Sequence, residues 1–302
     1  MKKIILVAGA TGDLGLRIVK SLVNLNAEIR AVVRPTSDTD KINTLEKLGV
    51  KVYKVDKWNL EELKTPCLGV SCVVSALAGL REVVIDAQKI LLDAAIAAGV
   101  SRFIPSDYSL DFTKFSSGEN RNLDLRREFH EYLDKTSIAA TSIFNGAFSE
   151  LLTNEMPMIL FKQKMILYWG NADHKMGFTT KDNTADYTAK VALDTSTPRY
   201  LRIAGDLISP REVKVIASEV TGQKFRLFRP GGQSLLGVII KIARKLAPAE
   251  KELYPAWQGM QYMHNMIDVR SKIDKLNNDR YPEIQWTTVK DVLSKYQHTI
   301  SN

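Results

Sequence analysis

A glycine-rich turn near the start of the chain constrains the fold more than any other feature. Residues 4–8 form a short apolar run, Ile-Ile-Leu-Val-Ala, and glycines follow it at positions 9, 12 and 15. Apolar residues then recur with helical spacing to about Leu25. Glycines let the backbone approach a bound group closely, and the amides at a helix start attract negative charge. A strand, a glycine turn and a helix in this order predict a site for the pyrophosphate of a dinucleotide. The alternative is a tight turn that binds nothing.

The end of the second predicted strand, residues 29–33, indicates which dinucleotide binds. Arg34-Pro35-Thr36-Ser37 follows this strand, and the position that would hydrogen-bond a free ribose 2′-hydroxyl holds no carboxylate. A guanidinium with neighbouring hydroxyls suits a 2′-phosphate, because both partners are charged and the hydrogen bonds are forked. The sequence therefore favours NADP(H) over NAD(H). The alternative is that Arg34 is a solvated charge at the end of a strand.

Strands and helices alternate through the first half of the chain. Apolar runs at 52–55, 70–75, 102–105 and 140–144 have the length of strands, and helical patterns at 41–48, 60–63, 82–98 and 123–133 separate them. This alternation predicts an α/β fold with a doubly wound parallel sheet, the Rossmann arrangement. Since ligands bind beyond the carboxyl ends of such strands, we expect Gly9, Arg34, Ser75 and Pro105 to share one crevice.

The length of 302 residues and a change of pattern after residue 150 predict two domains. We expect residues 1–150 to form the nucleotide-binding Rossmann domain, to which 178–204 return. Residues 151–177 and 205–302 then form a smaller α+β substrate-binding lobe. A basic and apolar helix at 235–246 is expected to pack its apolar face on this lobe, and contact with a membrane surface is the alternative. The aromatic and methionine-rich segment 254–266 either covers a substrate pocket or belongs to the core.

Composition and charge argue against several other classes of protein. No apolar run approaches the roughly 18 residues that cross a bilayer, and no signal-type segment starts the chain, so we expect a cytoplasmic protein without a membrane partner. Cys67 and Cys72 lack metal-type spacing to a histidine, and His264 with Asp268 is interpreted as a packing pair, so we expect no metal. The net charge of +8 is spread along the chain, which favours a polyanionic cofactor over nucleic acid.

Several blocks of sequence resemble the NmrA-like branch of the atypical short-chain dehydrogenase/reductase superfamily, near the isoflavone reductase and phenylcoumaran benzylic ether reductase group. They are residues 9–15, 33–35, 73–76, 98–108 and 178–190. The likeness runs in order from the N-terminus to about Phe228. It implies an NADP-binding domain, a smaller substrate domain, and either reductase activity or redox-linked regulation.

The predicted cofactor contacts lie at the glycine turn and at the ends of the later strands. They are Gly9, Thr11, Gly12, Asp13, Leu14, Gly15, Arg34, Thr36, Ser37, Ser75, Ala76, Pro105, Ser106 and Asn145.

The catalytic acid of the resembled group is missing. Those reductases carry a lysine four residues before an Arg-Arg pair, and here Asn122 takes that position ahead of Arg126-Arg127. The usual superfamily pair, a Tyr followed four residues later by Lys, is also missing at Tyr108, Tyr132 and Tyr187. Tyr108 remains the best proton-donor candidate, with Asn122 nearby. A phenol titrates near pH 10, so Lys114 or Arg121 would have to assist it. The alternative is a loop tyrosine anchored by its hydroxyl.

Two functions remain open. The leading prediction is an NADPH-dependent reductase of a small apolar substrate with an aromatic carbonyl or a quinone-like group, in which hydride transfer depends on positioning. A quinone demands little of a protein acid, because it takes its proton from water afterwards. The alternative is a catalytically silent sensor that binds NADP(H) and reports it to a protein partner.

Overall fold

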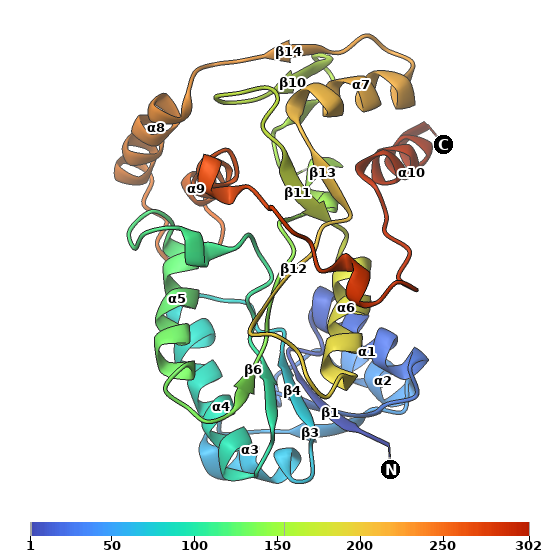
Figure 1. The fold of residues 1–302 in the computed structure, drawn as a ribbon. Coiled ribbons are helices and arrows are strands. Elements are labelled where there is room, and N and C mark those ends of the chain that lie inside the picture. Colours follow the sequence, from blue (N-terminus) through green and yellow to red (C-terminus); the bar gives the residue numbers. More distant parts are fainter. Residues whose placement is uncertain (1, 154, 302) are drawn as a thin grey trace. The chain divides into compact units, whose positions relative to one another are not determined.

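The computed structural model describes residues 2–153 and 155–301 (Figure 1). Contacts along the chain divide it into two compact units. The first unit comprises Met1–Tyr108, Leu125–Ile143 and Thr184–Leu201, and the second comprises Ser109–Asp124, Phe144–Asn183 and Arg202–Asn302. Residues 109–124, which the sequence placed with the nucleotide-binding domain, make most of their contacts within the second unit. Each unit is described by itself.

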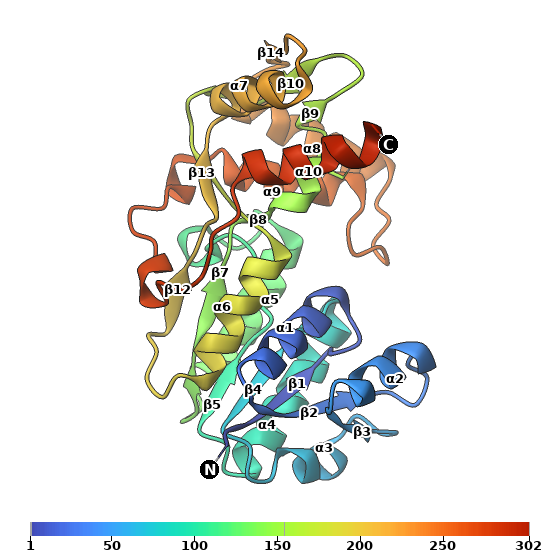
Figure 2. The same ribbon diagram turned by 90° about the vertical axis from the view of Figure 1, so that its right-hand side faces the viewer.

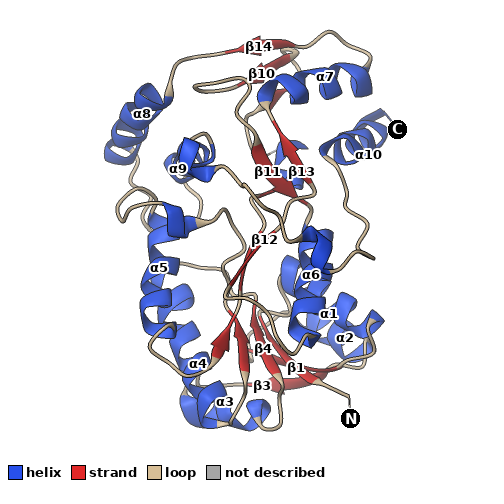
Figure 3. Ribbon diagram, viewed as in Figure 1, coloured by secondary structure: helices blue, strands red, loops and turns tan. Residues whose placement is uncertain are grey.

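A parallel sheet forms the centre of the first unit (Figure 3). Its strands stand in the order β3-β2-β1-β4-β5-β6, and every neighbouring pair is parallel. The central strands are almost entirely apolar because helices cover both faces of such a sheet. This arrangement confirms the predicted doubly wound α/β fold. The strands are β1 (Ile4–Ala8), β2 (Glu28–Val33), β3 (Lys51–Lys54), β4 (Cys72–Ser75), β5 (Arg102–Ile104) and β6 (Ala139–Ala140).

Helices alternate with these strands along the chain. In Figure 2, α1 and α6 lie side by side, and the Ser21 hydroxyl donates to Asp186 across them at 2.6 Å. The helices are α1 (Asp13–Asn24), α2 (Thr39–Lys47), α3 (Leu60–Cys67), α4 (Gln88–Ala97), α5 (Arg121–Leu133) and α6 (Lys181–Leu193). The single helix predicted for 82–98 begins as a π-helical segment, Glu82–Ala87, before α4. Among the described residues, no helix is both long and apolar enough to span a bilayer.

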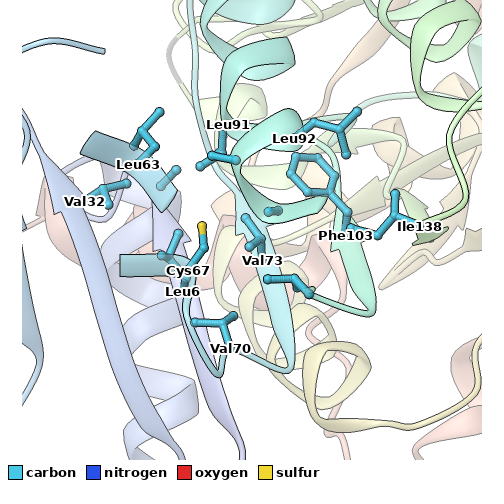
Figure 4. Packing of buried hydrophobic residues seen from close by; sticks show 14 of the residues in the cluster. Leu6, Val32, Leu63, Cys67, Val70, Val73, Leu91, Leu92, Phe103 and Ile138 are labelled. Carbon is cyan, nitrogen blue, oxygen red and sulfur yellow. The ribbon is translucent and has the colours of Figure 1, made fainter. Parts of the chain in front are cut away.

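The core of the first unit lies between the sheet and the helices α3 and α4. Figure 4 shows Leu6, Val73 and Phe103 of the strands packed together with Cys67 and Leu92 of the helices. These side chains are fully buried. Burial of this much apolar surface is the main force that holds the helices on the sheet.

The strand predicted at 140–144 is two strands with different partners. β6 pairs with β5, whereas β7 (Ser142–Phe144) pairs with β12 (Tyr200–Arg202). The prediction of one strand was wrong because an apolar run carries no information about its partner. A change of partner at Thr141 is visible only in the folded chain.

Two small sheets and several helices build the second unit. β13 (Asp206–Ile208), β11 (Met176–Thr179) and β8 (Ala147–Phe148) form one sheet, and β14 (Arg226–Phe228), β10 (Met165–Leu167) and β9 (Ile159–Leu160) form the other. The helices are α7 (Pro210–Thr221), α8 (Gln233–Leu246), α9 (Ala256–Met266) and α10 (Val289–Ser301). Short 3-10 turns occupy Phe112–Lys114, Ser149–Thr153, Val269–Ser271 and Asn278–Arg280. A capping box of Ser209 and Glu212 starts α7, which stabilises the first turn.

Candidate functional site

The glycine turn after β1 brings three stretches of backbone into direct contact. Gly9 has a φ of +81°, and a Cβ there would lie 2.6 Å from the carbonyl oxygen of Ala76. A Cβ at Gly15 would lie 2.1 Å from the carbonyl oxygen of Gly9. The Gly12 amide donates to that same oxygen at 2.9 Å. Side chains at positions 9 and 15 would therefore force the turn open.

The start of α1 presents backbone amides beside this turn. The helix begins at Asp13, and its N-cap residue, Gly12, has no side chain to satisfy the first-turn amides. These amides belong to Asp13, Leu14 and Gly15, and they stand at the positive end of the helix dipole. Thr11 is half-buried next to them, and the Asp13 carboxylate pairs with Arg17 at 2.7 Å. A helix start of this kind attracts an anion.

Arg34 follows β2 and is exposed. Within the described part of the chain, no carboxylate pairs with its guanidinium. The Ser37 amide donates to the Arg34 carbonyl at 3.0 Å, which closes a turn that carries Thr36. The nearby carboxylate of Asp38 caps α2 instead, because it accepts from the amides of the first helical turn. A phosphate would therefore meet an available guanidinium here.

The ends of the central strands lie at one edge of the sheet, as the sequence predicts. Ala8 of β1 is in register with both Val32 and Ser75, and the Ala76 amide donates to the Ala8 carbonyl at 2.8 Å. Val74 is in register with Ile104, so Pro105 comes to the same edge. The Ser75 hydroxyl is buried there and has no hydrogen-bond partner among the described residues. A bound ligand would satisfy it.

The loop after β5 is held from three directions. The Ser106 amide donates to the side chain of Gln88 at 2.9 Å, and the Ser106 hydroxyl donates to the Leu77 carbonyl at 2.5 Å. Arg126 of α5 donates to the Ser106 carbonyl at 3.1 Å. Gln88 and Arg126 were not anticipated as part of the site. Their contacts join residues far apart in the chain, so no local pattern signals them.

Asp107 and His130 form a buried pair next to this loop. Their Oδ2 and Nε2 atoms are 2.6 Å apart, and both side chains are shielded from solvent. Burial alone would raise the pKa of the Asp107 carboxyl, but the charge and hydrogen bond of His130 outweigh burial and lower it. Ser142 lies 3.3 Å from the same ring nitrogen and accepts a hydrogen bond from Arg199. The pair ties α5 to the residue that precedes Tyr108.

Tyr108 is a buried residue of the first unit. Burial raises the pKa of its phenol, and the neighbouring charge of Asp107 raises it further. Thr188 is beside it but donates its own proton to the Thr184 carbonyl, and no hydrogen bond of normal geometry reaches the phenol oxygen in the part of the chain described. These surroundings make Tyr108 a weaker acid than a free phenol, which is the opposite of what a proton donor needs.

Asn145 belongs to the second unit, where it directly follows β7. Its side chain is fully buried, and neither amide atom has a partner among the residues described. The Thr179 hydroxyl donates to its backbone carbonyl at 2.6 Å. Gly146 follows with a φ of +68°, and a Cβ there would lie 2.2 Å from the carbonyl oxygen of Gly177. The close contact of these two segments holds Asn145 in place.

Comparison with known proteins decides the family. The model of the NmrA-like family matches residues 1–291. This chain belongs to the NmrA-like family.

Relatives of this NmrA-like chain match nearly all of its length. It is 24% identical over 317 residues to the bifunctional pinoresinol-lariciresinol reductase 2 of Thuja plicata, which covers 97% of this chain and 98% of that protein. The crystal structure of isoflavone reductase superposes with a TM-score of 0.82 at 18% identity, over 98% of this chain and 100% of that one. The structure of AtPrR2 with NADP+ and (+)pinoresinol superposes with a TM-score of 0.82 at 21% identity, over 98% of this chain and 99% of that one. These likenesses show a shared fold.

Asn122, near the start of α5, is the residue predicted from the sequence to stand in place of a catalytic lysine. Its side-chain amide donates to the Leu253 carbonyl at 3.0 Å and accepts from the Arg121 guanidinium at 3.0 Å. Arg121 in turn donates to the carbonyls of Glu252 and Leu253 and stacks on Trp257 at 4.7 Å. Lys114 donates to the Lys272 carbonyl. Asn122 and both cations considered as helpers of Tyr108 are thus engaged within the second unit.

Proposed function

We propose that this NmrA-like chain is an NADPH-dependent reductase of a small apolar substrate that carries an aromatic carbonyl or a quinone-like group. One observation carries the proposal. A helix start without a capping side chain, behind glycines packed backbone to backbone, stands at the same sheet edge as Arg34. An anion site and an available guanidinium at this edge support binding of a pyrophosphate and a 2′-phosphate. The NADP+ and pinoresinol bound by AtPrR2 support the same cofactor and an aromatic substrate.

Different residues at the sheet edge bind different parts of the cofactor. The glycines of the turn allow the pyrophosphate to approach, and the first-turn amides of α1 bind it. Arg34 holds the 2′-phosphate with the hydroxyls of Thr36 and Ser37. The strand ends line the remainder of the cofactor. The set within the first unit is Gly9, Thr11, Gly12, Asp13, Leu14, Gly15, Arg34, Thr36, Ser37, Ser75, Ala76, Pro105 and Ser106. Asn145 stays a prediction from the sequence.

The chemistry favours an acceptor that needs no strong protein acid. NADPH supplies a hydride when it is bound. The raised pKa of Tyr108 and the hydrogen bonds of Asn122 leave neither residue suited to protonate a substrate. Hydride transfer to a quinone gives a hydroquinone anion, which then takes a proton from water. The work of the protein is then to hold both partners in contact.

The test is turnover across a panel of acceptors. Purified protein is mixed with NADPH and with quinones, aldehydes and enones, and the loss of cofactor absorbance is followed. We expect oxidation with quinones and little with substrates that need an acid. Absence of oxidation across the panel, in protein shown by calorimetry to bind NADPH, would contradict the reductase.

A second function is favoured by Asn122. The position at which related reductases hold a lysine is occupied by an amide that is bonded to the Leu253 carbonyl. A sensor that binds NADP(H) without turnover requires no acid at this position. Capture of a protein partner that depends on the redox state of the nucleotide, together with no turnover, would support the sensor.

A further inference from the structure

One face of α8 carries a row of apolar side chains that nothing in the chain covers among the described residues. Leu235, Val238, Ile242 and Leu246 are 46%, 52%, 53% and 79% exposed. Their spacing of three and four residues places them on one side of the helix. We call them the α8 row.

Packing within the second unit uses a different face of α8. Leu236 and Ile240 are buried, and α8 packs against α9 (Figure 1). The expectation that the apolar face of this helix packs on its own lobe therefore accounts for these two residues and leaves the α8 row unexplained. Other large apolar side chains that are exposed, such as Leu25 and Val215, are scattered over separate elements. A contiguous row of this kind marks an interaction surface.

Positive charge borders the α8 row. The sequence of α8 contains Lys241, Arg244 and Lys245 and no Asp or Glu. Neither lysine forms an ion pair within residues 2–153 and 155–301, while Arg244 lies over the Trp257 ring at 5.1 Å. At helical spacing, Lys241 follows Val238 by three residues and Lys245 follows Ile242 by three, so both lysines run along one side of the row.

We propose that the α8 row and its lysines dock on the surface of an anionic lipid bilayer. The helix lies in the plane of the surface, the row enters the boundary of the acyl chains, and the two ammonium groups meet the phosphates of the lipids. Lysine suits this position because its long stem follows the apolar surface while its charge stays in water. A lipid surface needs no matching shape, which agrees with a row that stands out on an exposed helix. Tyr254, 62% exposed in the segment between α8 and α9, adds an aromatic ring with a polar tip.

The proposal is tested by flotation of the full chain with lipid vesicles. One set is phosphatidylcholine, and the other contains phosphatidylglycerol as well. We expect binding to the anionic set and release at high salt. Replacing both lysines, Lys241→Gln with Lys245→Gln, weakens binding by roughly thirtyfold, since each cation near such a surface contributes about 1 kcal/mol. Replacing two members of the row, Ile242→Ser with Leu246→Ser, weakens it by about tenfold or more.

A matched control separates this surface from general effects of charge and apolarity. Lys64 and Leu68 are exposed on and next to α3, and the double variant Lys64→Gln, Leu68→Ser should bind vesicles as the unmodified chain does. All variants change exposed side chains, so their thermal unfolding should be unaltered. Absence of binding to anionic vesicles, or equal binding by the α8 variants, would overturn the proposal. Self-association that the Ile242→Ser, Leu246→Ser variant abolishes would also overturn it, because the row would then be an interface between copies.

Discussion

Replacement of Gly15 by alanine tests the glycine turn most directly. The new Cβ would lie 2.1 Å from the Gly9 carbonyl oxygen, 2.7 Å from the Gly9 carbonyl carbon and 3.0 Å from the Cα of Ala10. Every one of these atoms is backbone, so no side-chain rotation relieves the contact. Non-bonded heavy atoms of this kind rest about 3.5 Å apart, so the turn must separate from α1 by more than about 1 Å.

Two opposing effects set the size of the change. Overpacking of this kind costs typically 1–3 kcal/mol, and the backbone contact places Gly15→Ala toward the upper end. Alanine in a helix gains about 1 kcal/mol over glycine. The net loss in the free energy of unfolding is therefore about 2 kcal/mol, which lowers the Tm by roughly 4–8 °C. Displaced amides at the start of α1 should also raise the Kd for NADPH by about tenfold or more.

Gly259→Ala is the matched control for this prediction. Gly259 also lies in a helix, α9, but a Cβ there would meet nothing within 4 Å. This variant should be unchanged or more stable by up to about 1 kcal/mol. Calorimetric melting and isothermal titration with NADPH measure both variants. If Gly15→Ala melts and binds as the unmodified chain does, the steric account of the turn is wrong.

Three further predictions address the cofactor, the buried pair and the thiols. Arg34→Gln should raise the Kd for NADPH by roughly ten- to a hundredfold and leave the Kd for NADH nearly unchanged. If calorimetry shows an equal effect on both nucleotides, Arg34 does not bind the 2′-phosphate. Asp107→Asn should lower the free energy of unfolding by about 3 kcal/mol, because it leaves His130 buried beside a neutral partner. Folding lowers the pKa of Asp107, so its carboxylate contributes fully to the free energy of unfolding above the ordinary pKa of about 3.9, and this contribution is lost as the pH falls below that value. Denaturant titrations should therefore show the unmodified protein and the Asp107→Asn variant converging in stability in that range. A stability difference that stayed constant with pH would contradict the role of the pair. Burial raises the pKa of the Cys67 and Cys72 thiols to about 12, so a thiol reagent near neutral pH should label neither in the native protein and both in denaturant; rapid labelling of the native protein would show that they are accessible.

The arrangement of the first unit could be predicted from local features of the sequence. Gly15 indicates the turn because a side chain there is excluded by Gly9 and Ala10, only a few residues away. Gly9 indicates it through its φ of +81°, which favours glycine, although the backbone that a Cβ there would meet belongs to the distant Ala76. The apolar runs indicate strands, and their alternation with helices leaves a parallel sheet as the solution. Once the sheet is parallel, the positions of Gly9, Arg34, Ser75 and Pro105 at one edge follow from strand direction alone.

The environment of each candidate side chain was decided by tertiary structure. Gln88 holds Ser106, His130 holds Asp107, and Asn122 bonds to Leu253. Each contact joins residues from separate segments of the chain, and no sequence periodicity links them. The acidity of a phenol depends on what surrounds it, and burial weakens Tyr108 as an acid although its place in the sequence suggested a donor.

The sequence by itself determined that α8 is an apolar helix with basic residues, and tertiary structure alone decided which of its faces is covered. Local patterns report the constraints that neighbouring residues place on the backbone. The burial, the partners and the exposure of a side chain depend on segments that come together from distant parts of the chain. Hydrophobic association between such segments is non-directional, so the sequence of one segment does not specify which other segment it packs against.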